Sequence, residues 1–574
     1  MKLRVILATA VAAAAFGGAR AQQNHLRSDV VSVGRDMPRG NIVCYSTRDE
    51  ALAGGLAPSL YLQPLTAWKS SGQGSEAAFK RPFAWVDREV FVHVGGATAA
   101  YDLYVNDTHA GYNECGTVPA DFNITALAKE GANTLRVELH ADAATRALEN
   151  GRDPREASLP GPVYIFSQPK VRVRDVVDDS RWEEGHGLLS FGAVIKSHLL
   201  NVKTYRVYYE LLSPEGEIVA RGNRDINLDM QREDTLRFFS NIPDIVPWTH
   251  ETPYLYTLMI KTQHEGRFKE YLALPVGFKT MEFDGGRMKI NGIETPLYAA
   301  EYSCPDLAAL RQPGDTLPDR ELLVREMSRL RETGVNTLKV KGHTQPDVFY
   351  DVCDELGFYV IDQADIDTHL AGEKITRGGN PSNDPRWEEI YVDRVLSAYH
   401  RTKSHPSTIA LSLAENSANG YCLYEGYLAL KRCERRRPVI YREARGEWNS
   451  DPLELLPAAG APKAAAGKRV TLSGGGKGEF RVANEMIYTP FCGELAYKVK
   501  SMGKVVASGT CSVRVAPGAQ SVVSVPLEAV KDGRSCTVAV ELLAPAGGTR
   551  YRHGADVSRR VTLSEMEVKV DGKR

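Results

Sequence analysis

Residues 320–361 read RELLVREMSRLRETGVNTLKVKGHTQPDVFYDVCDELGFYVI. The first part has apolar residues at helical spacing as far as Gly334, which ends the helix, and Val335–Val340 then has the apolar pattern of a strand. The second part repeats this order, with a helical Phe349–Leu356, a stop at Gly357 and a short apolar strand. Helices and strands that alternate in this way predict a parallel α/β unit.

The same alternation continues toward the C-terminus. Helical spacing returns over 387–403 and 420–435, and apolar strand patterns follow at 408–413 and 438–441. The α/β region therefore extends from about residue 285 to residue 451. At roughly 31 residues per strand–helix unit, this length holds about five of the eight units of a closed barrel. We predict an incomplete TIM-type (β/α) barrel.

The regions on both sides of the barrel have a different pattern. Residues 22–170 and 171–284 contain short runs of alternating apolar and polar residues between turn signals, which predicts two β sandwiches, the second immunoglobulin-like. Residues 469–574 return to this pattern and predict a third, C-terminal β sandwich. The segment 452–468 is rich in Pro, Ala and Gly and is predicted to be a linker or a loose covering segment.

Residues 1–21 have the composition of a secretory signal peptide. Lys2 and Arg4 precede an apolar stretch, and Ala19-Arg20-Ala21 supplies a small-residue cleavage signal. We therefore expect an exported protein, either periplasmic or secreted. No later segment reaches about 18 uninterrupted apolar residues, so no membrane span is predicted. A net charge of −1 gives no general attraction to nucleic acid.

The nine cysteines are scattered along the chain and odd in number, which is not the pattern of a disulfide framework. Cys511 and Cys536 lie in one predicted β domain, so a bond between them stays an open alternative. No C-x-x-C pair and no histidine cluster with zinc spacing occurs in the sequence. The sequence therefore predicts no metal site and no cofactor.

Several motifs occur in an order shared with one enzyme family. They are Tyr104-Val105-Asn106 and Pro119–Thr125, Trp248 with Pro253 and Tyr256, Asn291-Gly292, Asp362–His369 (DQADIDTH), His405-Pro406-Ser407 and Gly503–Gly509 (GKVVASG). Together with the order sandwich, sandwich, barrel, sandwich, they resemble the family 2 glycoside hydrolases of the β-galactosidase type. The resemblance covers most of the chain and implies that the first sandwich is a jelly-roll, sugar-binding-like domain.

The resemblance also implies where catalysis would occur. Retaining hydrolysis uses two carboxylates about 5–5.5 Å apart, and in this family the acid/base Glu follows an Asn at the end of strand four. Residues 411–417 read LSLAENS, so Glu415 occupies the Asn position and Asn416 the acid/base position. An amide has no titratable proton, and successive residues of a strand face opposite ways. We expect an impaired acid/base, the alternative being a turn of the backbone that lets Glu415 act as the acid.

The nucleophile of the family lies on strand seven, and no clear strand–helix alternation follows Tyr441 before the last sandwich. Strands six to eight are therefore expected to be absent, and the nucleophile with them. Glu443 and Glu447 lie nearby and are weak alternatives for that role, since most surface glutamates only contact solvent.

Three further residues are candidates for sugar binding by resemblance. Asp142 matches an Asp that reaches the sugar site of the family, His369 matches the His of strand three, and His343 lies one position away from the usual His of strand two. Each has an ordinary structural explanation as well, as a turn-capping carboxylate or a hydrogen-bonded histidine at the barrel rim. Residues 298–304 lack the charged run that the family has at strand one.

These observations predict an exported homologue of the family in carbohydrate metabolism, catalytically impaired and serving glycan binding or assembly. The alternative is an active or altered β-galactosidase or β-glycosidase that uses Glu415. An incomplete barrel also has open edges and an apolar inner face that must be covered. The candidates for this cover are the linker, an N-terminal segment, a second copy of the chain, or a partner protein.

Overall fold

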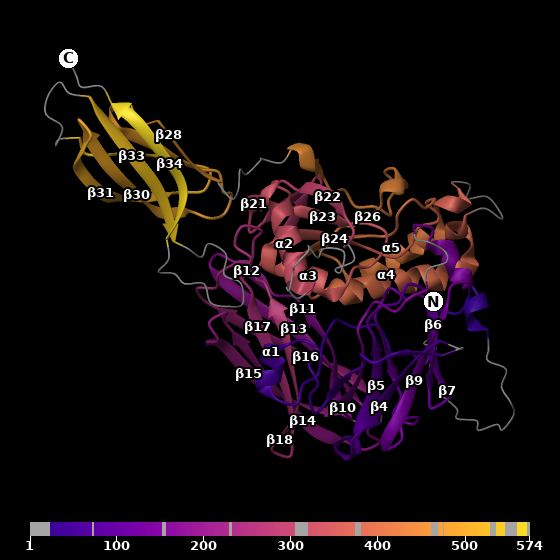
Figure 1. Ribbon diagram of the computed structural model, residues 1–574. Helices are drawn as coiled ribbons and strands as arrows, with labels where there is room; N and C mark the ends of the chain where they lie inside the picture. The colour runs from indigo at the N-terminus through magenta and orange to yellow at the C-terminus, as the bar shows by residue number, and fades with distance from the viewer. Residues whose placement is uncertain are drawn as a thin grey trace.

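The computed structural model describes residues 23–71, 74–151, 157–228, 232–304, 319–372, 380–460, 469–474, 476–527, 535–545 and 560–570. The predicted signal peptide and residues 461–468 of the predicted linker lie outside the described residues. Figure 1 shows two β sandwiches packed beneath an α/β region, and a third sandwich that projects from it.

The first sandwich packs two antiparallel sheets face to face. Its strands are β1 (Ser32–Val33), β2 (Leu62–Pro64), β3 (Lys69–Ser71), β4 (Gly74–Arg81), β5 (Arg88–Val94), β6 (Ala100–Val105), β7 (Thr108–Asn113), β8 (Ala120–Asn123), β9 (Gly131–His140) and β10 (Val163–Pro169). The sheet orders are β1-β7-β6-β9-β4-β3 and β2-β10-β5-β8. Alternating apolar side chains such as Val92, Leu103 and Ile165 meet between the sheets and form the core.

The second sandwich has the same construction. Its strands are β11 (Val171–Asp178), β12 (Arg181–Glu183), β13 (His186–Ser197), β14 (Lys203–Leu212), β15 (Ile218–Leu228), β16 (Glu233–Ile242), β17 (Tyr256–His264) and β18 (Arg267–Val276). One sheet has the order β15-β14-β17-β18, and in the other β13 pairs with β11, β12 and β16. The helix α1 (Arg48–Ala53) packs on β18 and begins with a capping box between Thr47 and Glu50.

The third sandwich contains β28 (Val470–Gly474), β29 (Glu479–Asn484), β30 (Phe491–Ser501), β31 (Lys504–Val515), β32 (Gln520–Ser524), β33 (Cys536–Pro545) and β34 (Arg560–Val570). Its sheets have the orders β28-β29-β32 and β31-β30-β33-β34. Cys511 and Cys536, which the sequence left open as a disulfide pair, are both free. They cannot be joined here because β31 and β33 flank β30 on opposite sides.

The α/β region is an open parallel sheet with helices on its outer side. Its elements are β22 (Tyr298–Tyr302), α2 (Asp319–Glu332), β23 (Thr337–Val340), α3 (Asp347–Leu356), β24 (Tyr359–Gln363), α4 (Glu388–Thr402), β25 (Thr408–Ser412), α5 (Tyr421–Cys433), β26 (Val439–Ile440) and β27 (Leu456–Pro457). The strand order is β26-β25-β24-β23-β22-β27, and every pairing is parallel. The predicted partial TIM-type barrel is present, with a sixth short strand.

The sixth strand comes from the segment that the sequence assigned to a linker. After β26 the chain returns to β22 and adds β27 on its free side, the side opposite β23. Before β27, Leu453 and Leu455 pack against the apolar cluster that contains Trp248, Ile361 and Ile409. Part of the inner face is therefore covered by residues 452–457 of the same chain.

A small three-stranded sheet packs against the same apolar cluster. It consists of β19 (Met281–Asp284), β20 (Arg287–Ile290) and β21 (Ile293–Glu294). Met288 and Ile290 are buried in the cluster that contains Trp248, while Met281 and Phe283 pack against it. The backbone amide of Glu454 donates a hydrogen bond to Gly286 O at 2.8 Å, which ties the returning segment to this sheet.

Buried ion pairs join the first sandwich to the barrel. Arg394 of α4 is fully buried and pairs with Glu114 at 2.7 Å and with Glu149 at 2.9 Å. Its Nη1 also donates to the backbone oxygen of Asp365. These contacts fix the first sandwich against the ends of the barrel strands. Among the described residues, no helix is long and apolar enough to cross a membrane.

Candidate functional site

Polar side chains from five consecutive strand ends meet at the carboxyl end of the parallel sheet. Glu301 lies on β22, Lys339 on β23 and Gln363 at the end of β24. Glu415 follows β25, and Glu443 lies in the short 3-10 helix η8 (Arg442–Ala444) after β26. Active sites of TIM-type barrels lie at this end, where the strand–helix loops converge.

Glu415 points toward the neighbouring strands. Its backbone amide donates to Ile366 O at 2.8 Å, which extends the parallel pairing beyond β25. Its Oε2 accepts a hydrogen bond from the backbone amide of Gly342 at 3.0 Å and another from Gln363 Nε2 at 3.4 Å. The carboxylate is therefore held in one place next to β23 and β24.

Asn416 has a different environment although it is the next residue. Its backbone lies in the left-handed region with φ of 46°, a conformation that Asn tolerates better than most residues. Its side chain is exposed, and Nδ2 donates to Asp367 Oδ2 at 3.4 Å. The residue that the resemblance assigns to the acid/base position is an amide, which has no titratable proton.

Glu443 is the second carboxylate of this region and is half-buried. Burial raises the pKa of Glu443, and the negative charge of Glu415 raises it further. Lys339 and Arg442 act in the opposite direction without cancelling the effect. Glu443 therefore holds its proton to a higher pH than an ordinary glutamate, and it lies close enough to Glu415 to sense its charge.

An open cleft of about 940 Å³ lies beside Glu443. His369, Asn416, Asn419, Glu443 and Glu447 line it, together with Ser417, Arg442 and Arg445. Oε2 of Glu447 accepts hydrogen bonds from Tyr424 Oη at 2.6 Å and from Asn419 Nδ2 at 3.3 Å, which ties Glu447 to α5. The cleft offers both donors and acceptors, as the binding of a polyhydroxylated ligand requires.

His369 is placed by Asp367. Oδ1 of Asp367 lies 2.8 Å from His369 Nδ1 and accepts the backbone amide of the same residue at 3.0 Å. The other carboxylate oxygen of Asp367 accepts from Asn416. One aspartate thus joins His369 and Asn416, two of the predicted site residues, on one wall of the cleft.

His343 lies elsewhere. It lines a separate cavity of about 530 Å³ between the first sandwich and the barrel, beside Gln345 and Tyr164. Its Nδ1 lies 2.9 Å from the backbone oxygen of Thr344. The backbone of Gly342, rather than His343, makes the contact with Glu415.

Asp142 does not line the cleft either. It is exposed in the turn after β9, at the start of the loop 141–151. That loop reaches the barrel further on, where Leu148 O accepts the amide of Asp367 at 2.7 Å and Asn150 N donates to Asp367 O at 3.0 Å. The loop therefore supports the wall of the cleft, while Asp142 stays at its outer end.

Sequence reasoning missed three residues of the site. Lys339 Nζ lies 4.0 Å from Glu301 Oε1, and the two residues are direct partners between β23 and β22. Gln363 is fully buried, and its Oε1 has no hydrogen-bond partner among the described residues. The signal was available, because each residue lies at or near the carboxyl end of a predicted parallel strand.

Comparisons with known proteins agree with this architecture. Residues 313–455 match "Glycosyl hydrolases family 2, TIM barrel domain", and residues 171–279 match "Glycosyl hydrolases family 2". The chain is 28% identical over 419 residues to a β-galactosidase of Priestia megaterium, covering 71% of this chain and 39% of that protein. It is 26% identical over 370 residues to a β-galactosidase of Halalkalibacterium halodurans, covering 63% and 35%. The chain thus spans well under half the length of these curated relatives.

A solved structure shows the same fold. The β-glucuronidase of Bacteroides uniformis superposes with a TM-score of 0.54 at 12% sequence identity, covering 86% of this chain and 74% of that one. The order of the domains, the strand ends that carry the polar residues and the matches over 171–279 and 313–455 lead to one conclusion. The chain belongs to glycoside hydrolase family 2.

Proposed function

We propose that this protein binds a β-linked glycan in the cleft at the carboxyl end of the barrel strands and has lost the retaining hydrolysis of its family. The observation that carries the proposal is Asn416. It occupies the acid/base position, is exposed beside the cleft and donates to Asp367. An amide cannot protonate a leaving oxygen or activate water.

The path of the chain after β26 supports the same proposal. Residues 441–460 are described throughout, and their only strand is β27, which pairs with β22. The positions of two intervening barrel strands are therefore not filled within this stretch, and the resemblance places the nucleophile on one of them. The second carboxylate that retaining hydrolysis requires therefore has no strand to carry it within this stretch.

An exposed aromatic side chain beside the cleft supports binding. Trp448 is 57% exposed and stacks on Tyr424 with 5.3 Å between the ring centroids. The hydroxyl of Tyr424 donates to Glu447, which lines the cleft. An exposed indole of this kind offers a flat apolar surface for the C–H face of a sugar ring, next to the hydrogen-bonding groups of the cleft.

The matched relatives named β-galactosidases suggest a galactoside-like sugar as the first ligand to test. The signal-like composition of residues 1–21 suggests that binding occurs after export, in a periplasm or outside the cell.

A second candidate function is hydrolysis by a relocated pair, with Glu443 as the acid and Glu415 as the nucleophile. The raised pKa of Glu443 favours it, because retaining hydrolysis uses one carboxyl with a raised pKa as the acid beside a second carboxylate. Catalysis on this route requires both side chains to act on one glycosidic oxygen and carbon.

Glycan binding is tested on an array of β-linked oligosaccharides, followed by titration of the tryptophan fluorescence of the purified protein with the best ligand. We expect saturable binding that Trp448→Ala weakens about tenfold, a loss of about 1.4 kcal/mol. Trp182, on β12 of the second sandwich, supplies the matched control as Trp182→Phe. Unchanged affinity in Trp448→Ala would contradict the assignment of the cleft.

Hydrolysis is tested with aryl β-galactoside, β-glucoside and β-glucuronide reporters. We expect no turnover by the wild-type protein, Glu415→Gln or Glu443→Gln. Turnover that both substitutions abolish and that Glu447→Gln leaves intact would replace the binding proposal with the second candidate function.

A further inference from the structure

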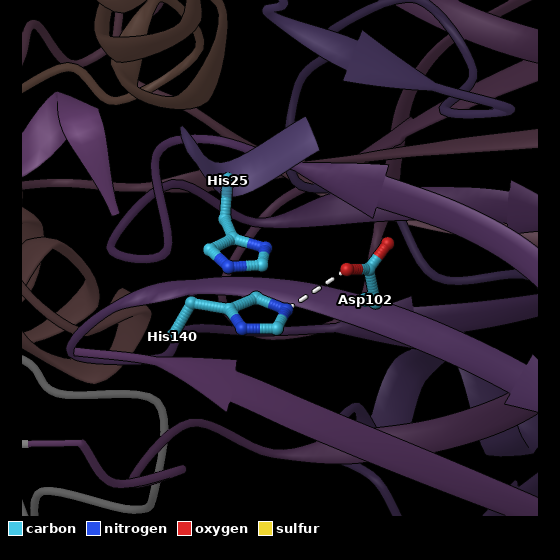
Figure 2. Close-up of side chains that lie close together, drawn as sticks. All are labelled: His25, Asp102 and His140. Carbon is cyan, nitrogen blue, oxygen red and sulfur yellow. Dashed lines mark hydrogen bonds and ion pairs between the residues drawn. The ribbon is translucent and has the colours of Figure 1, made fainter. Parts of the chain in front are cut away.

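Three potential metal ligands meet where the N-terminal segment crosses the first sandwich. His25 lies on the short 3-10 helix η1 (Asn24–Leu26), Asp102 on β6, and His140 at the end of β9. Figure 2 shows the two imidazole rings stacked and Asp102 beside them. The ring centroids are 3.9 Å apart with 4° between the planes, and His140 Nε2 lies 2.8 Å from Asp102 Oδ2. One ligand atom from each residue lies within 4.8 Å of the other two.

His25 has an unused nitrogen in this cluster. Its Nδ1 is buried and has no hydrogen-bond partner among the described residues. A buried polar atom without a partner is costly and calls for a specific explanation, and a neutral imidazole nitrogen is the form that binds metal ions.

Asp102 is fixed in orientation by two histidines. Its Oδ2 lies 2.8 Å from His140 Nε2. His109 Nε2 lies 2.7 Å from Oδ1, the oxygen that His140 does not contact. Such a partner orients a ligating carboxylate and increases the affinity of the site.

We propose that His25, Asp102 and His140 bind a divalent first-row transition-metal ion of the Zn²⁺ type. Imidazole nitrogen and carboxylate oxygen are zinc ligands at about 2.0–2.2 Å, and a tetrahedral ion then holds neighbouring donor atoms about 3.3 Å apart. His140 Nε2 and Asp102 Oδ2 are 2.8 Å apart, and one ligand atom from each of the three residues lies within 4.8 Å of the others, so rotation of the side chains would bring them to that spacing. Three protein ligands leave one position for water.

The bound ion would fasten the N-terminal segment to the sandwich and steady the loop 141–151. That loop begins directly after His140 and contacts Asp367 through Leu148 O and Asn150 N. Asp367 in turn holds His369 and Asn416 at the cleft. The ion would thus have a structural role. It would stabilise the loop 141–151, whose contacts with Asp367 support the wall of the cleft that contains His369 and Asn416. This inference does not depend on hydrolysis or on the identity of the sugar.

This site is not visible in the sequence, because its ligands lie far apart along the chain. Asp102 and His140 come together only because β6 and β9 are neighbouring strands. The other group of such residues among the described parts of the chain is Asp351, Asp354 and His405. There Asp354 already accepts from His405 Nδ1 at 2.7 Å and from the amide of Ser407 at 2.8 Å. That group is a satisfied structural network, and we assign no ion to it.

The test is a Zn²⁺ titration of the full chain, purified without a histidine tag and stripped with a chelator, in competition with a chromophoric indicator. We expect one ion per chain with micromolar or tighter affinity. His25→Ala should weaken binding at least tenfold, and His109→Asn, which changes only the partner of Asp102, about tenfold. His186→Ala, an exposed histidine on β13, is the matched control and should leave the affinity unchanged.

Three further measurements distinguish loss of the ligand from loss of the fold. Circular dichroism checks that His25→Ala is folded, and Co²⁺ substitution should give d–d absorption bands in the wild-type protein that are lost in His25→Ala. Zn²⁺ should also raise the thermal midpoint of the wild-type protein and not that of His25→Ala. Absence of stoichiometric binding, or binding that folded His25→Ala retains in full, overturns the proposal.

Discussion

Glu415 and Asn416 are neighbours in the chain, but the structure gives them opposite environments. The carboxylate of Glu415 is held by the Gly342 amide and by Gln363, whereas Asn416 adopts a left-handed backbone and lies exposed at the cleft. If the proposed loss of hydrolysis is right, a single substitution at Asn416 does not restore activity, because that proposal also leaves the chain without the strand that carries the nucleophile. A single substitution can, however, test the raised pKa of Glu443.

Glu443→Gln should stabilise the protein at pH 8 and not at pH 4. The pKa of Glu443 is raised in the folded state by burial and by Glu415, so its contribution to stability is complete below its ordinary pKa and falls as the pH rises through the raised value. The half-exposed side chain is screened by solvent, which limits the gain to less than about 1 kcal/mol. This gain in stability is measured from the thermal midpoints of the variant and the wild-type protein at both pH values. An equal difference at pH 4 and pH 8 would contradict the assignment, and Glu447→Gln is the control on the same cleft.

At the scale of elements, the segment 451–457 replaces part of a barrel. Its hydrogen bonds to β26, to Gly286 and to Leu297 carry the chain across the open side of the sheet. Leu453 and Leu455 point into the cluster around Trp248, whereas Glu454 between them is exposed. This alternation is what a strand-like segment with one buried face requires.

Leu453→Ala combined with Leu455→Ala should destabilise the barrel by about 2–4 kcal/mol, because both side chains are partly buried against an apolar cluster. We expect a lower denaturation midpoint and increased binding of a hydrophobic dye. Glu454→Ala, between the two leucines, should change stability by less than about 0.5 kcal/mol. Similar effects from all three positions would show that the segment does not cover the inner face.

At the scale of the whole molecule, the first sandwich and the barrel are joined by charges buried between them. Arg394 is fully buried and pairs with Glu114 and Glu149, and Glu149 also pairs with Arg146 at 2.9 Å. Burial raises the pKa of Glu114 to about 7 even though Arg394 opposes this rise. Arg394 is thus the cation that the two buried carboxylates share.

Arg394→Met should cost about 3–5 kcal/mol at pH 8, because it leaves the buried carboxyl of Glu114 without its cationic partner, so that Glu114 must either stay charged in the interior or take up a proton. The cost should be smaller at pH 5.5, where Glu114 is protonated. Chemical denaturation at both pH values measures the difference. Arg394→Met with Glu114→Gln should recover part of the loss at pH 8, and the exposed Arg386→Met is the control. An identical loss at both pH values would show that the arginine acts through packing alone.

Local patterns were enough to predict most of the fold. Helical spacing ended by Gly334 and Gly357 predicted α2 and α3, and apolar runs predicted β23, β24 and β25, because the periodicity of helices and strands is a property of consecutive residues. The exchange at Glu415 and Asn416 was also visible in the sequence alone. The strand β27 was not, since two residues in a Pro- and Ala-rich segment carry no periodicity and pair only because the edge of β22 is open to them.

The sequence by itself therefore determined the order of sandwiches and barrel and the resemblance to the family, and it predicted an amide at the acid/base position. Only the tertiary structure decided that Glu443 lies near Glu415, that His343 faces a different cavity from His369, and that His25 stacks on His140. The physical reason is the range of the interactions. Periodicity and turn chemistry act over a few residues, whereas side chains from distant segments meet only after the sheets have set their positions in space.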